Sequence, residues 1–182
     1  MTLARILAAL AVCSIAACKP SASADYAVAE DAEPARTAPS TPIASPDTAQ
    51  SAWARSADGA RLLYGDSGAA PYFSLGCEDG MLVYTRHAAA DPDAKAMLAL
   101  IGNGHVERLF VDAERQGAGW SWRGRLPAND PRLDVLTGGR RVEATVPGAG
   151  SLILNPSSAP GAFITACASA SAPPPSRPAD PA

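Results

Sequence analysis

The sequence predicts a mainly β fold, an antiparallel sandwich or barrel of about eight strands with one or two short helices. Short runs of alternating apolar and polar residues fill the middle of the chain. Asp-Gly and Asn-Gly pairs, which favour tight hairpin turns, separate these runs. All 3 Trp and nearly all large apolar residues lie between residues 51 and 168. We therefore expect the β domain there.

The strands are expected mostly as hairpins. In chain order the paired arms are 53–56 with 60–64, 72–77 with 81–86, 96–101 with 105–112, and 140–146 with 151–155. Residues 119–126 also alternate and predict a further strand, whose inward face carries Trp120 and Trp122. Those indoles could instead stack on a sugar, but a place in the core is the simpler expectation.

Two short helices follow from capping signals. Asn129 or Asp130 can cap the first helix, and Gly138 can end it. Ser157 or Ser158 can cap a last helix near the end of the domain.

The N-terminus has the pattern of an export signal. Residues 6–17 form an uncharged apolar run that, at about 1.5 Å per residue, is too short to cross a hydrocarbon core of about 30 Å. The run ends Ile15-Ala16-Ala17-Cys18, which resembles the lipobox of bacterial lipoproteins. The resemblance implies cleavage after residue 17 and diacylglycerol, with further acyl chains such as palmitate, on Cys18. The alternative is a plain signal peptide cut near Ala17 or Ala24.

Residues 1–17 are thus expected as a lipoprotein signal peptide and 18–50 as a lipid anchor with a disordered tether. Residues 51–168 would be the β domain and 169–182 a disordered tail rich in Pro, Ala and Ser. A binding stretch around Tyr26 and a polyproline ligand in the tail are the alternatives for the two flanks. By resemblance to enterobacterial sorting, Lys19 favours the outer membrane, facing the periplasm.

Two cysteines lie inside the expected domain. An exported chain meets an oxidising compartment, so a disulfide between Cys77 and Cys167 is expected. Two buried free thiols or a redox pair are the alternatives, although the chain has no Cys-x-x-Cys.

No residues combine into a recognisable reaction centre. His87 and His105 lack partners at metal-ligand spacing, and the chain has no Gly-x-Ser-x-Gly elbow. The paired carboxylates fall at turns or strand ends, as solvated acids do. Arginines 123, 125, 140 and 141 could form a small basic patch or simply alternate on an exposed face. With 15 Lys+Arg against 18 Asp+Glu the net charge is -3, which argues against nucleic-acid binding. We therefore expect no catalytic residue, no metal and no cofactor.

Two family resemblances add expectations. Residues 73–80, with Tyr84 and the run 96–102, look like the small β-barrel lipoproteins that inhibit lysozyme. Their inhibitory loop, Ser-Ala-x-Gly-Ala-x-Tyr, is replaced here by Val111–Gly117. Over roughly 53–167, the order of Trp, Cys-ended strand, Trp strand, helix, hairpin and Cys-ended helix is similar to small proteobacterial envelope lipoproteins, including type VI secretion accessory proteins.

The expected function is therefore a non-catalytic cell-envelope lipoprotein, acting as a structural or protein-interaction module. It would meet the membrane through its anchor and an envelope protein or the cell wall through its domain. The alternatives are a periplasmic lysozyme inhibitor and a hydrolase with an unrecognised site.

Overall fold

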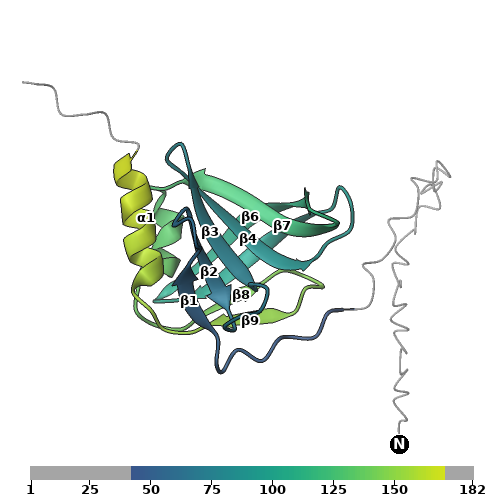
Figure 1. The fold of residues 1–182 in the computed structure, drawn as a ribbon. Helices are drawn as coiled ribbons and strands as arrows, with labels where there is room; N and C mark the ends of the chain where they lie inside the picture. Colours follow the sequence, from purple (N-terminus) through teal and green to yellow (C-terminus); the bar gives the residue numbers. More distant parts are fainter. Residues whose placement is uncertain (1–41, 171–182) are drawn as a thin grey trace, which may run out of the picture. The chain divides into compact units, whose positions relative to one another are not determined.

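The computed structural model describes residues 42–170, which form an antiparallel sheet curled into a nearly closed barrel (Figure 1). Its strands are β1 (Ala52–Arg55), β2 (Arg61–Gly65), β3 (Phe73–Glu78), β4 (Met81–Ala89), β5 (Lys95–Gly102), β6 (His105–Gln116), β7 (Gly119–Pro127), β8 (Val142–Thr145) and β9 (Ser151–Leu154). Their order in the sheet is β1-β2-β3-β4-β7-β6-β5-β8-β9. A 3₁₀ helix, η1 (Pro131–Leu136), precedes β8, and helix α1 (Ala159–Ala170) follows β9. The mainly β prediction is confirmed.

Turn chemistry places the hairpins where the sequence predicted them. Asp79 and Asn103 have φ values of 49° and 51°. Asn and Asp tolerate this left-handed region better than most residues, and a glycine follows each of them.

Asn103 also ties its turn to the first helix. Its Nδ2 donates to the carbonyl of Val135 at 2.9 Å, and its Oδ1 accepts from the amide of Arg140 at 2.9 Å. Asp130 caps η1 as predicted, and the helix ends at Leu136 with Thr137 as its C-cap, directly before Gly138. Gly138 does not have the positive φ of a left-handed cap. It lies against the Asn103 side chain, where a Cβ would collide.

The inward face of the strands makes one continuous apolar core. Phe73, Tyr64 and Tyr84 are at most 1% exposed. Trp122 is buried and Trp120 packs half-buried against the same core, as the strand alternation predicted. The phenol groups of Tyr64 and Tyr84 are satisfied, because each hydroxyl donates to a backbone carbonyl of a strand that does not pair with its own.

Tyr64 helps close the barrel. Its hydroxyl donates to the carbonyl of Ile153 on β9 at 2.8 Å and accepts from the amide of Asn155 at 3.0 Å. These bonds join β2 to β9, which lie near opposite ends of the strand order. The Tyr64 side chain therefore links two strands whose backbones do not pair with each other.

The segment before β1 covers the remaining edge. The amide of Ile43 donates to Gly148 at 2.9 Å, and Nδ2 of Asn155 donates to the carbonyls of Thr48 and Ser51 at 2.7 and 2.9 Å. Thr48 is buried. The packed chain thus extends ahead of residue 51, the expected start of the domain.

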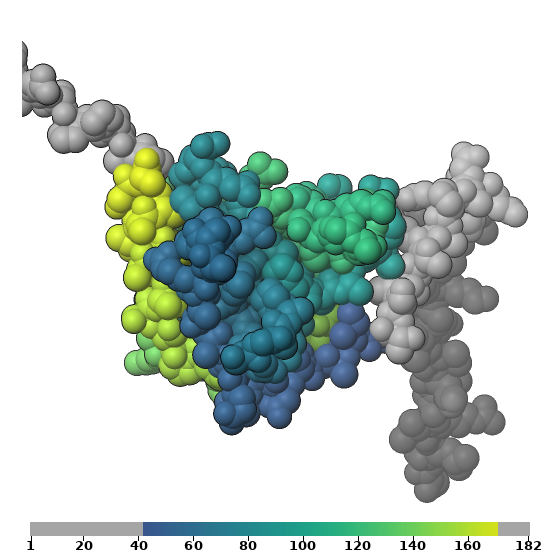
Figure 2. Space-filling model, in the orientation of Figure 1, coloured from purple at the N-terminus to yellow at the C-terminus, as the bar shows by residue number. Residues whose placement is uncertain are grey.

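Helix α1 lies against one side of the barrel beside η1 (Figure 1), and appears as the yellow flank in Figure 2. Ser157 caps it, since its Oγ accepts from the amide of Ala159 at 3.1 Å. The helix buries Phe163, Ile164 and Cys167. It is therefore held to the barrel by its apolar side rather than by its own propensity.

One charged side chain, Arg86, is 2% exposed on the inward side of β4. Its Nη1 and Nη2 donate to the carbonyls of Tyr72 and Ala149, each at 3.1 Å. No carboxylate of residues 42–170 pairs with it. The hydrogen bonds of Arg86 therefore link the loop before β3 to the turn between β8 and β9.

Candidate functional site

The disulfide fixes the relation between barrel and helix. Cys77 on β3 and Cys167 on α1 are bonded, with their Cα atoms 5.6 Å apart. This is the pair that the sequence predicted, so neither thiol is free for redox or nucleophilic chemistry. Cys18, the expected lipidation site, lies outside the described residues.

A polar cleft lies on the outer side of β3, β4 and β7. It is lined by Arg61, Ser74, Gly76, Glu78, Val83, Thr85, His87, Gln116 and Arg123. Ser74 Oγ lies 2.8 Å from His87 Nε2, and Ser74 is 4% exposed. Residues 74 and 87 are close because β3 and β4 form a tight hairpin. The sequence did not predict this pair, because the contact depends on the register of β3 on β4.

The surroundings of His87 do not suit general-base chemistry. Burial lowers the pKa of His87, and the positive charges of Arg86 and Arg61 lower it further. No carboxylate of the described residues contacts the ring to orient it or to stabilise an imidazolium. Ser74 is also almost inaccessible to a substrate. The Ser74–His87 contact is therefore better explained as a link between β3 and β4 than as a nucleophile and its base.

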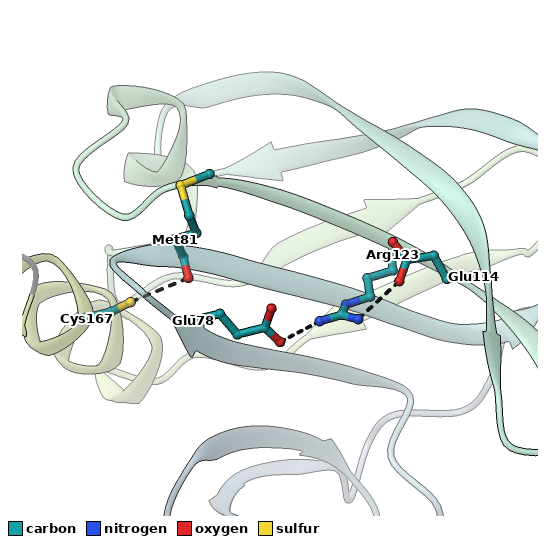
Figure 3. A network of polar contacts seen from close by, with 5 residues as sticks. All are labelled: Glu78, Met81, Glu114, Arg123 and Cys167. Carbon is teal, nitrogen blue, oxygen red and sulfur yellow. Dashed lines mark hydrogen bonds and ion pairs between the residues drawn. The ribbon is translucent and has the colours of Figure 1, made fainter.

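Arg123 is held between two acids in the same cleft (Figure 3). Its guanidinium pairs with Glu78 at the end of β3 and, at 3.1 Å, with Glu114 on β6. Nearby, the carbonyl of Met81 lies 3.7 Å from Sγ of Cys167 (Figure 3). Arg123 therefore adds no free positive charge to the possible basic patch, because Glu78 and Glu114 already compensate its guanidinium.

A second surface lies on the outer side of β5 and β6. Ile101, Val106 and Phe110 are 48%, 60% and 75% exposed. The strand register sets Ile101 opposite Val106 and half-buried Met97 opposite Phe110. We call this set of residues, with Arg108, the β5–β6 face. Isolated exposed apolar residues are ordinary, whereas these three residues share one side of a single hairpin with Arg108.

The sequence contained a signal for this face. Leu109, Phe110 and Val111 are consecutive apolar residues on one strand. Because neighbouring side chains point to opposite sides, Phe110 has to face outward when Leu109 and Val111 face the core. Only the direction of the core decides which of them is exposed.

The described residues were also compared with what a metal site requires. Within residues 42–170, no three His, Cys, Asp or Glu side chains come together as a metal site would require. Comparisons of the chain with protein families, with curated proteins and with solved structures found no match. Among the described helices, none is long and apolar enough to cross a membrane.

Proposed function

We propose that this chain is a lipid-anchored protein of the cell envelope whose β domain is a non-catalytic contact module. The β5–β6 face carries the proposal, because Phe110, Val106 and Ile101 leave apolar area in water on an otherwise well-packed domain. A contact that removes this area from water would be favourable by roughly 25 cal/mol per Å².

The envelope location is supported by two features from different parts of the chain. The motif ending at Cys18 resembles a lipobox. The Cys77–Cys167 disulfide is the kind of bond that persists in exported proteins and is rare in reducing compartments. Each buried acyl CH₂ contributes about 0.8 kcal/mol, so several acyl chains would hold the domain at a bilayer.

The anchor is tested by expressing the full chain in a bacterium and measuring the intact mass of the product. We expect cleavage after residue 17 and a mass increase from acyl chains on Cys18. The matched control is Cys18→Ser, which should retain the signal peptide and carry no acyl chain. An unacylated wild-type product would contradict the anchor.

A hydrolase is the second candidate, favoured by the 2.8 Å contact between Ser74 Oγ and His87 Nε2. Its test is the release of product from activated esters by the full chain and by Ser74→Ala. The proposed contact module predicts no turnover above that of Ser74→Ala. Turnover that disappears in Ser74→Ala would establish the hydrolase instead.

A further inference from the structure

The composition of the β5–β6 face indicates what it contacts. Its apolar residues do not form a closed patch, because Arg108 lies between Val106 and Phe110 on the same side of β6. Arg125 is exposed on the neighbouring strand β7. No carboxylate of residues 42–170 pairs with either arginine. Two uncompensated guanidinium groups thus accompany the exposed aromatic ring.

The other charges near this face are less available. Lys95 pairs with Asp112 at 2.9 Å at one end of the hairpin. Half-buried Glu143 lies opposite Ile101 on β8, and no cation of residues 42–170 pairs with its carboxylate. Arg108 and Arg125 together with Glu143 still leave one positive charge in excess, which favours an anionic partner.

The hairpin lies inside the strand order, between β8 and β7. β5 pairs with β8 over Ala99–Gly102, and β6 pairs with β7 over Asp112–Gln116. The exposed side chains of the face therefore project from a sheet that continues on both sides of the hairpin.

We propose that the β5–β6 face rests on the surface of an anionic phospholipid bilayer, the membrane that holds the anchor. This inference rests on the proposed function. A bilayer interface accepts Phe, Ile and Val at the acyl boundary, while the arginines keep their charged ends among the lipid phosphates. Guanidinium groups bind phosphate with charge-assisted hydrogen bonds. An apolar protein surface would instead bury Arg108 without a partner, which is costly.

Because the anchor already holds the chain at the membrane, the β5–β6 face needs only a weak affinity for the bilayer to be bound most of the time. The chain between Cys18 and residue 42 reaches at most roughly 80 Å when fully extended, so the domain stays near the bilayer. This confinement raises its effective concentration at the lipid surface, and a face that binds weakly in solution is then occupied. The same confinement lets the domain turn until its most apolar side meets the lipid.

Two methionines provide an internal comparison for the test. The sequence has 3 Met, and cleavage after residue 17 would leave Met81 and Met97. Both are half-buried in the domain, but Met97 lies on the β5–β6 face and Met81 lies at the start of β4 beside Cys167. Exposed methionine is oxidised to the sulfoxide, so the ratio of the two oxidation rates measures how far the face is covered.

The experiment uses the acylated full chain in vesicles of phosphatidylethanolamine and phosphatidylglycerol, treated with hydrogen peroxide. We expect Met97 to be oxidised several-fold more slowly, relative to Met81, in the wild type than in the variant Val106→Ser/Arg125→Ser, which leaves Phe110, the cross-strand neighbour of Met97, in place. Both replaced residues are exposed, so the variant should fold, and an unchanged circular dichroism spectrum would confirm this. Raising the salt concentration should also speed Met97 oxidation in the wild type.

Equal Met97/Met81 ratios in wild type and variant would overturn the proposal. Protection that depends on added envelope proteins would identify a protein partner instead, and protection that grows with the protein-to-lipid ratio would identify a second copy. Acylation is read from the intact mass of the same sample. A missing acyl mass with a protected Met97 overturns the anchor alone, whereas an acylated chain with an unprotected Met97 overturns the docking alone.

Discussion

Replacing Cys77 and Cys167 together by alanine should lower the free energy of unfolding by about 4–5 kcal/mol, because an unfolded chain without the bond gains loop entropy. The two residues are 90 positions apart, so the bond closes most of the domain into one loop. For a loop of this length the chain-entropy relation gives the stated figure. Domains of this size have a total stability of only about 5–15 kcal/mol.

The structure indicates that the reduced domain should still fold. Helix α1 buries Phe163 and Ile164 against the barrel, and these contacts do not depend on the bond. The variant should therefore show a cooperative unfolding transition at a lower denaturant concentration rather than a loss of structure. Guanidinium unfolding followed by tryptophan fluorescence measures the shift.

Reduction of the wild type supplies the control. Wild type in a thiol reductant should match the double alanine variant, and the variant itself should not respond to the reductant. A loss of less than about 1 kcal/mol would refute the reasoning, because the loop-entropy contribution would then be absent or offset by strain.

Three further changes test the interior and the cleft. Arg86→Ala should cost about 2–3 kcal/mol in urea unfolding, because the buried carbonyl of Ala149 loses the Arg86 donor and the carbonyl of Tyr72 keeps only the amide of His87. Gly124→Ala should cost about 1–3 kcal/mol in the same assay, since a Cβ there would collide with the carbonyl of Phe110 and the ring of Tyr84. Burial lowers the folded-state pKa of His87, so the unfolded chain binds its proton more readily. The wild type should therefore be most stable above pH 6.5 and lose stability as the pH falls toward the lowered pKa, whereas His87→Gln should lose less.

Each of these changes has a matched control in the chain. Arg61→Ala removes an exposed arginine from the cleft and should alter stability by less than about 0.5 kcal/mol. Gly119→Ala adds a Cβ that meets nothing within 4 Å. His105→Gln replaces an exposed histidine. If a test variant behaved like its control, the packing or burial argument for that residue would be contradicted.

The hairpins and caps could be predicted because their causes are local. Asn103 and Asp79 lie at turn positions that need positive φ. Asp130 lies directly before η1, and Ser157 lies two residues before α1. The sequence also placed the end of η1 near Gly138, and the helix ends at Leu136. The contact of Gly138 with Asn103 could not be predicted, because Asn103 is distant in sequence.

The candidate surfaces depended on the arrangement of strands. The Ser74–His87 contact needs the register of β3 on β4, and the ion pairs of Arg123 need β3, β6 and β7 together. The arginines of one possible basic patch differ in role for the same reason. Arg123 is compensated by two acids, while Arg125 on the same strand remains exposed.

By itself the sequence determined the mainly β class, the hairpins, the two short helices and the cysteine pair, because alternation, turn residues and caps act over a few positions and only two cysteines lie in the domain. Only the tertiary structure decided that the sheet curls into a barrel closed by Tyr64 and Asn155, and that Phe110 faces water. Strand order, register and the direction of the core come from contacts between residues far apart in the chain. An alternating pattern defines two faces of a strand, and only packing determines which of them is buried.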